Sequence, residues 1–260
     1  MIRFENVVKR FAGREVLSGV TFEVRDGEIL AVVGPSGTGK SVTLKHMVRL
    51  LTPTSGKVWL DDVEISSASG KALEAVRERF GYLFQGGALL GWLTVAENVA
   101  LPLRERTRLK PAEIDSRVAE ALAAVELSHA ADLYPAEISG GMQKRAGLAR
   151  AIVRQSDIIL YDEPTSGLDP VTSVTINRLI KRLNAERKMT SILVTHDLQG
   201  ALLFADRILM LKGGRVVLVA PPAEFVHSDI PEVREFLSAQ LITPSILEYP
   251  LLREPETTSH

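Results

Sequence analysis

The segment EILAVVGPSGTGKS, residues 28–41, decides the fold of this chain. Its first part, ILAVV (29–33), is a short apolar run bounded by a glycine, which predicts a buried strand. The second part has the spacing G-x-x-x-x-G-K-[ST], in which a glycine-rich turn and the following helix surround a phosphate with main-chain N–H groups. Average residue usage produces this pattern by chance in roughly one chain of this length in a hundred. The segment therefore predicts a strand, a phosphate-binding loop and a helix over about residues 40–51.

Composition narrows the remaining possibilities. The 260 residues carry a net charge of -1 and are 45% hydrophobic, which is typical of a globular protein without the basic field that nucleic acid binding requires. The absence of cysteine excludes disulfides, thiol catalysis and thiolate metal sites. No signal peptide is expected at the amino terminus, and the apolar runs fall far short of the roughly 20 residues of a membrane helix. We expect a protein that lies outside the bilayer and has no nucleic acid partner.

Strand and helix signals alternate in two parts of the chain, and a mostly helical block separates them. This alternation predicts an α/β fold with a mostly parallel sheet flanked by helices. We expect one domain with a tail, divided as follows: domain 1–240, with a catalytic core of 1–85 and 154–220, a helical subdomain of about 86–153 and C-terminal helices at 221–240; tail 241–260.

A second apolar strand ends in two carboxylates. In DIILYDEP (157–164), the apolar run leads directly to Asp162 and Glu163. A carboxylate at the end of a strand suits Mg²⁺, and its neighbour is placed to orient or deprotonate an attacking water. Alone, the pair is equally compatible with ordinary surface acids. Beside a phosphate-binding loop, it predicts a site that hydrolyses a nucleotide.

Five further motifs appear in a characteristic order: KRFAGREVL with Phe11, YLFQGG with Gln85, ISGGM at 138–142, SGLDP with Asp169 and THD with His196. Together with the phosphate loop they resemble the nucleotide-binding domain of ABC transporters over roughly residues 1–220. The resemblance implies the fold of a P-loop NTPase. This fold has a RecA-like, mostly parallel sheet with an antiparallel β segment, and an inserted α-helical subdomain.

The resemblance also implies ATP and Mg²⁺ as cofactors and assigns roles at the site. Glu163, His196 and Lys40 match the family's catalytic residues, and Ser41, Gln85 and Asp162 match the residues around the metal. Phe11 matches an aromatic residue that stacks on adenine. The residues that correspond to the ATP-binding set are Phe11, Gly34, Pro35, Ser36, Gly37, Thr38, Gly39, Lys40, Ser41, Val42, Gln85, Ser139, Gly140, Gly141 and Asp162.

Partners follow from the same resemblance. Family members form a head-to-tail homodimer, in which Ser139 and Gly141 of one chain close over the ATP of the other, and they drive an integral-membrane permease. We therefore expect a cytoplasmic protein, peripheral on the cytoplasmic face of the inner membrane. One position departs from the family: Met142 replaces the usual glutamine of the signature. Since the serine and glycine donors remain, we expect retained activity.

Residues 83–105, 137–152 and 231–237 resemble the ATPases of MCE-linked lipid transporters of the Mla type. This implies transport of phospholipid or another hydrophobic substrate across the bacterial envelope, with an MCE-domain substrate-binding subunit. An importer or exporter of another substrate, such as amino acids, is the alternative. A non-transport ABC ATPase is less favoured, because the chain has one cassette, no cysteine and no heptad repeats. A scaffold without turnover is disfavoured by Glu163 and His196.

The tail, residues 241–260, is too apolar for a solvated end. Pro244, Pro250 and Pro255 nevertheless exclude one long helix. Two packings fit this pattern. The tail either folds back on its own domain or reaches across to a second copy of the chain.

Overall fold

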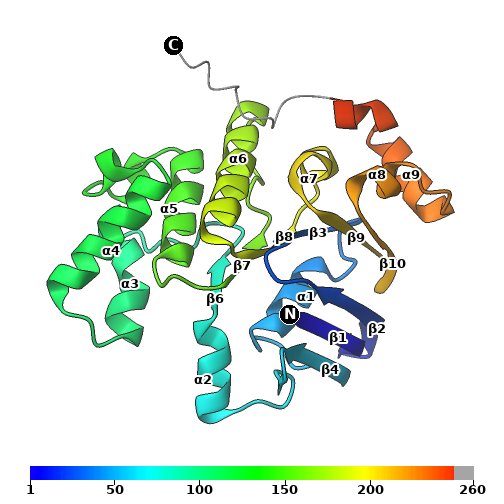
Figure 1. Ribbon diagram of the computed structural model, residues 1–260, viewed down its shortest axis with the longest axis horizontal. Helices are drawn as coiled ribbons and strands as arrows, with labels where there is room; N and C mark the ends of the chain where they lie inside the picture. Colours follow the sequence, from blue (N-terminus) through cyan, green and yellow to red (C-terminus); the bar gives the residue numbers. More distant parts are fainter. Residues whose placement is uncertain (249–260) are drawn as a thin grey trace.

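The computed structural model describes residues 1–248, and a six-stranded sheet forms its centre (Figure 1). The strand order is β10-β9-β3-β8-β7-β6, with all strands parallel except β10 at one edge. The inner strands β3, β7 and β8 are buried along their whole length, which explains their continuous apolar runs. The bounds are β3 Ile29–Val33, β6 Phe80–Leu83, β7 Ile158–Asp162, β8 Thr190–Val194, β9 Arg207–Lys212 and β10 Arg215–Ala220.

A second, antiparallel sheet packs beside it in the order β2-β1-β4-β5. Its inward face includes Phe4 and Phe22, whose rings stack with centroids 4.6 Å apart. The bounds are β1 Ile2–Phe11, β2 Arg14–Val24, β4 Ser55–Leu60 and β5 Val63–Glu64. The expectation of a mostly parallel α/β core with an antiparallel β segment is confirmed.

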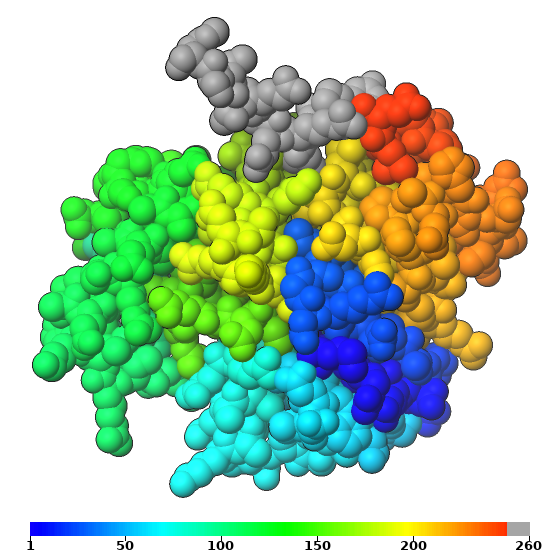
Figure 2. Space-filling view, in the orientation of Figure 1, coloured from blue at the N-terminus to red at the C-terminus, as the bar shows by residue number. Residues whose placement is uncertain are grey.

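The helices fall into groups around these sheets. α3, α4 and α5 lie between β6 and β7 in the chain and form a lobe at one side of the molecule (green in Figures 1 and 2). Their bounds are α3 Val95–Arg106, α4 Pro111–Ala124 and α5 Gly140–Ile152, with short 3₁₀ turns η1 Ser128–Ala130 and η2 Pro135–Glu137. The others are α1 Lys40–Met47, α2 Gly70–Glu78, α6 Pro170–Arg187, α7 Leu198–Phe204, α8 Pro222–Val226, α9 Pro231–Ala239 and η3 Pro244–Glu248.

The central sheet separates two apolar cores. Alternate residues of β3 show the division, because Leu30 and Val32 join the core under the antiparallel sheet and α1, whereas Ala31 and Val33 join the core under the helices. The second core also contains Leu103 and Leu148, so the α3–α5 lobe packs continuously with the sheet. The carboxyl ends of the parallel strands are thereby held on rigid elements.

Helix α1 ends earlier than the sequence predicts, at Met47 rather than near residue 51. Arg49 adopts a left-handed conformation with φ of 52°, and the N–H of Leu50 donates to the carbonyl of Lys45 at 2.9 Å. This is the hydrogen-bond pattern of a Schellman stop, which usually uses glycine at the left-handed position. Because arginine occupies it here, the sequence carries no visible stop signal.

The described part of the tail folds back on its own chain. Ile246 is buried against the helix-side core, and Ile242 and Leu247 pack on the same cluster, with η3 in contact with α7 and α8. Pro250 and Pro255, and the other tail residues from 249 onward, lie outside the described residues. Across residues 1–248, no helix combines the length and the apolar character that crossing a membrane requires.

Candidate active site

The phosphate-binding loop connects β3 to α1 and contains two glycines at which any side chain would collide with neighbouring atoms. Gly34 has φ of 140°, and a Cβ there would lie 2.0 Å from the Leu211 carbonyl oxygen. Gly39 has φ of 97°, and its Cβ would lie 2.5 Å from Leu17 Cδ2. No side chain caps the amino end of α1, so the first-turn N–H groups keep their donor capacity. The loop is a turn of main-chain donors at a helix amino terminus, which suits a phosphate.

Lys40 lies inside this loop. Its Nζ donates to the carbonyl oxygens of Gly34 at 2.8 Å and Pro35 at 3.0 Å, and the residue is buried. Burial lowers the pKa of Lys40, and the negative charges of Glu163 and Asp162 oppose that shift. The ammonium group is therefore short of counter-charge, and an arriving phosphate would supply it.

Hard oxygen ligands meet where β7 ends. Ser41 Oγ donates to Asp162 Oδ1 at 2.7 Å, and Tyr82 Oη donates to Asp162 Oδ2 at 3.3 Å. Burial, with the charge of Asp162 second, raises the pKa of Tyr82 well above its usual range. Residues 1–248 contain no cluster of three or more side chains of the metal-binding types. A hydroxyl beside one carboxylate still fits Mg²⁺, which commonly takes one or two protein oxygens and completes its shell with phosphate and water.

Glu163 and His196 form a pair beside this carboxylate. They follow the adjacent parallel strands β7 and β8, in which Asp162 pairs with Val194, so the sheet brings them together. His196 Nδ1 lies 2.6 Å from Glu163 Oε2, and the His196 main-chain N–H donates to the same oxygen at 3.3 Å. The Glu163 side chain is 13% exposed and that of His196 67%. A nearly buried carboxylate is thus held by the histidine close enough to Lys40 of the phosphate loop for their charges to interact, which suits a general base.

A family model described as "ABC transporter" matches residues 17–166. The chain belongs to the ABC transporter family. It is an ATP-binding subunit of an ABC transporter and an ATP hydrolase, with ATP and Mg²⁺ as its substrate and cofactor.

Relatives and solved structures support the membership. The chain is 43% identical over 243 residues to the probable ribonucleotide transport ATP-binding protein mkl of Mycobacterium tuberculosis, covering 94% of this chain and 68% of that protein. It is 38% identical over 242 residues to the methionine import ATP-binding protein MetN 2 of Pseudomonas entomophila, with 91% and 72% covered.

Among solved structures, the ATP-binding cassette MJ0796, in a dimeric post-hydrolysis state with ADP and Pi, aligns with a TM-score of 0.78 and 35% identity over 85% of this chain and 99% of that one. Also similar is cbiO1 of Clostridium perfringens, part of the ABC transporter complex cbiONQ, with a TM-score of 0.81, 29% identity, and 92% and 95% covered.

The signature loop of this ABC cassette lies apart from its own phosphate loop. Ser139 caps α5 by accepting from the Met142 N–H at 3.3 Å, and a Cβ on Gly141 would meet Thr172 Cγ2 at 2.6 Å. Within residues 1–248, no hydrogen bond or ion pair connects residues 139–141 to residues 34–41. The two loops also have different neighbours, because Gly140 and Gly141 lie beside Leu168 and Thr172, whereas Gly34 and Gly39 lie beside Leu211 and Leu17. Met142 itself is half-buried against the helix-side core.

Phe11 and Gln85 lie at the edges of the site. Phe11 ends β1 with 41% of its surface exposed, and Lys9 Nζ lies 5.0 Å from the centre of its ring. The partner strand β2 carries Leu17, which packs on Gly39 of the phosphate loop, so the hairpin borders that loop. The carbonyl of Gln85 accepts from the buried ammonium of Lys144.

Two residues at the site escape sequence reasoning, Tyr82 and Lys144. Tyr82 reaches Asp162 only because β6 pairs with β7 in a parallel register that sets Tyr82 beside Leu160. The position of Lys144 in the sequence could have indicated its role. The lysine occupies a position on the buried stripe of α5, between Gly141 and Leu148, where an unpaired lysine is not expected.

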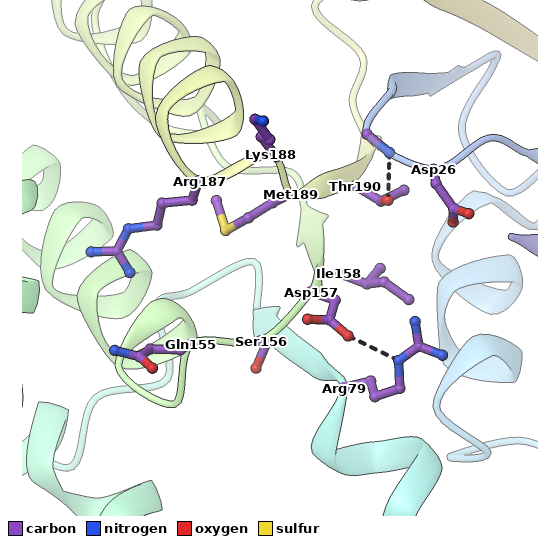
Figure 3. A pocket seen from close by; sticks show the side chains of 11 residues that line it. Asp26, Arg79, Gln155, Ser156, Asp157, Ile158, Arg187, Lys188, Met189 and Thr190 are labelled. Carbon is purple, nitrogen blue, oxygen red and sulfur yellow. Dashed lines mark hydrogen bonds and ion pairs between the residues drawn. The ribbon is translucent and has the colours of Figure 1, made fainter.

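A cavity of about 450 Å³ lies at the opposite end of the sheet, beside the amino ends of β7 and β8 (Figure 3). Its charged groups are partly neutralised among themselves: Arg79 Nε donates to Asp157 Oδ2 at 3.0 Å. The Gly27 N–H donates to Thr190 Oγ1 at 2.9 Å. None of the phosphate-loop residues or of the catalytic candidates lines this cavity. The phosphate loop, Asp162, Glu163 and His196 instead follow the carboxyl ends of β3, β7 and β8, where ligands of open α/β sheets usually bind.

Proposed function

We propose that this cassette is the ATPase of an MCE-linked transporter that moves phospholipid or another hydrophobic substrate across a bacterial envelope. The observation that carries the proposal is the Met-ending signature. Met142 packs its side chain against the helix-side core, so the departure from glutamine is accommodated in the packing of the lobe. An integral-membrane permease and an MCE-domain substrate-binding subunit are the proposed partners.

We assign the roles at the site as follows. Glu163 orients and deprotonates the attacking water, His196 holds Glu163 and contacts the γ-phosphate, and Lys40 supplies counter-charge to the phosphates. Ser41, Asp162 and Gln85 hold Mg²⁺, which supplies electrostatic stabilisation of the developing charge when it is bound. The loop residues Gly34, Pro35, Ser36, Gly37, Thr38, Gly39 and Val42 surround the phosphates, and Phe11 stacks on adenine.

The site is completed by a second copy of the chain. Since Ser139, Gly140 and Gly141 lie away from residues 34–41 of their own chain, we propose that they close over the ATP of a head-to-tail partner. Their N–H groups and the amino end of α5 would then face the γ-phosphate. The MJ0796 cassette is dimeric with ADP and Pi bound, which supports the association of two copies. In this scheme the domain consists of residues 1–240, with the core, lobe and C-terminal helices divided as the sequence predicts.

The permease is proposed to dock beside Gln85, on the loop that carries Trp92. The Trp92 side chain is 74% exposed, whereas the main chain of its loop is held by hydrogen bonds. Buried Asn98 donates to the carbonyl oxygens of Leu90 and Leu93, and the Arg150 guanidinium donates to that of Ala88 at 2.7 Å. An exposed aromatic residue on an ordered loop is typical of a protein contact site. Docking there would hold the cassette on the cytoplasmic face of the inner membrane.

The relatives favour a second candidate as well. One is named for ribonucleotide transport and another for methionine import, so a small polar substrate is the alternative. The test is to purify the cassette with its permease and to analyse the bound lipid by mass spectrometry. ATP turnover of the reconstituted complex is then measured with phospholipid, methionine or ribonucleotides.

We expect phospholipid to co-purify and turnover to depend on lipid. Stimulation by methionine or by ribonucleotides, without any bound lipid, would overturn the proposed substrate class while leaving the ATPase assignment intact.

A further inference from the structure

A buried lysine on the signature helix joins three segments of the site. Lys144 lies on the second turn of α5 and is 7% exposed. Its Nζ donates to the carbonyl oxygen of Gln85, to that of Glu163 at 3.2 Å and to Ser166 Oγ at 3.3 Å. An ammonium group has three N–H donors, and each is used here. All three acceptors are neutral, so the lysine is not part of a direct ion pair.

Glu163 needs this support because of its backbone conformation. Its φ is 53°, in the left-handed region that a glutamate rarely occupies. Its N–H donates to the carbonyl oxygen of Val194 at 2.9 Å. Its own carbonyl oxygen accepts from the Ser166 N–H at 3.2 Å, from Ser166 Oγ at 2.9 Å and from Lys144 Nζ. Lys144 thus supplies the one donor at this carbonyl that comes from outside the β7 strand and the turn after it.

The same ammonium connects Glu163 to the Gln85 segment. Gln85 follows β6 and stands at the start of the loop that leads to Trp92 and the α3–α5 lobe. Without Lys144, the Glu163 carbonyl would keep only its donors from Ser166, and the hydrogen-bonded link between Glu163 and Gln85 would be lost. The Lys144 side chain therefore connects both the Gln85 loop and α5 to the main chain of Glu163.

We propose that Lys144 is a positioning residue for ATP hydrolysis, whose ammonium fixes the main chain of Glu163 against the Gln85 loop and the signature helix. It does not touch the reacting atoms. The inference rests on the role of Glu163 assigned above. Its effect should therefore appear in the rate of the chemical step and should vanish when the Glu163 carboxylate is absent.

The test uses the full chain with Lys144→Met, which keeps the length of the side chain and removes its donors. We expect single-turnover ATP hydrolysis to fall roughly 10- to 100-fold, as loss of a positioned base implies, while the KM for ATP stays within about threefold. The matched control is Arg145→Met. Arg145 is the next residue of α5, and its guanidinium also donates to two main-chain carbonyl oxygens, those of Val125 and Glu126, but away from the site.

A double-mutant cycle with Glu163→Gln distinguishes an effect of Lys144 on Glu163 from a general disturbance of the structure. If Lys144 acts through Glu163, adding Lys144→Met to Glu163→Gln leaves the residual hydrolysis unchanged. An equal loss in both backgrounds would show a merely structural role and overturn the proposal, as would wild-type turnover by Lys144→Met. If Lys144→Met fails to fold, Lys144→Gln, which retains N–H donors, takes its place with the same expected pattern and an intermediate loss of rate.

If Glu163 is not the general base, the experiments give a different result. Wild-type turnover by Glu163→Gln alone would refute both the assignment of Glu163 as the base and the positioning role of Lys144. An inactive Glu163→Gln beside a fully active Lys144→Met would remove only the inference.

Discussion

Replacing Glu163 by glutamine tests the catalytic assignment with a minimal change of shape. Glutamine keeps an oxygen that can accept from the His196 N–H groups, which now lie 2.6 and 3.3 Å from Oε2. It cannot take a proton from water. Loss of a general base typically lowers a rate by about 10²–10⁴, which corresponds to about 3–5 kcal/mol on the barrier. We expect turnover of ATP to fall by that factor.

Binding and folding should survive this substitution. Lys40 and Ser41, the proposed phosphate and metal contacts, make no hydrogen bond to Glu163. The Glu163–His196 pair has one partner largely in solvent, and such pairs contribute about 0–1 kcal/mol to folding. The free energy of unfolding should therefore change by about 1 kcal/mol at most. The ATP-bound variant should accumulate as a dimer, because the γ-phosphate is retained.

The assay is phosphate release at saturating Mg²⁺ and ATP, with nucleotide affinity measured by calorimetry and the dimer by size exclusion. Lys40→Ala protein prepared in parallel sets the background from contaminating ATPases. Phosphate release by Glu163→Gln at the wild-type rate would refute the reasoning, since the chain would then contain a different base. A tenfold loss of ATP affinity would instead mean that Glu163 shapes the phosphate loop.

Three further predictions follow from other parts of the molecule. Lys40→Ala should weaken ATP binding about 10- to 100-fold in calorimetry, because a charge-assisted hydrogen bond to phosphate contributes about 1.5–3 kcal/mol; an affinity within twofold of wild type would contradict its role. Mixing inactive Ser139→Arg chains with inactive Lys40→Ala chains should restore some phosphate release, since one site of the heterodimer is intact; activity recovered in a monomeric fraction would argue against a shared site. Ile246→Ala should lower the free energy of unfolding by about 2–4 kcal/mol in denaturant titrations, because the side chain is buried on the helix-side core. The KM for ATP should not change. An unaltered midpoint of the unfolding transition would show that the 244–248 segment does not stabilise the fold.

The local elements of the site could be predicted from residues that are neighbours in the chain. The loop after β3 is specified by its own glycines, lysine and serine, and the phosphate site needs little beyond them. The apolar runs of β7 and β8 likewise predict buried strands whatever surrounds them. The end of α1 was predicted wrongly, because Arg49 makes a left-handed stop that is normally marked by glycine.

Which of these elements meet was decided by tertiary structure. Sequence order separates Glu163 from His196 by 33 positions and Tyr82 from Asp162 by 80, and only the strand order β8-β7-β6 places each pair in hydrogen-bond contact. The same limit applies to Lys144, because its three acceptors lie in the segments that follow β6 and β7, and nothing in its own helix specifies them. The phosphate-binding motif can be recognised from the sequence, because its donor groups are consecutive along the backbone. Contacts between motifs depend on sheet register and helix packing, which arise from burial of the whole apolar core.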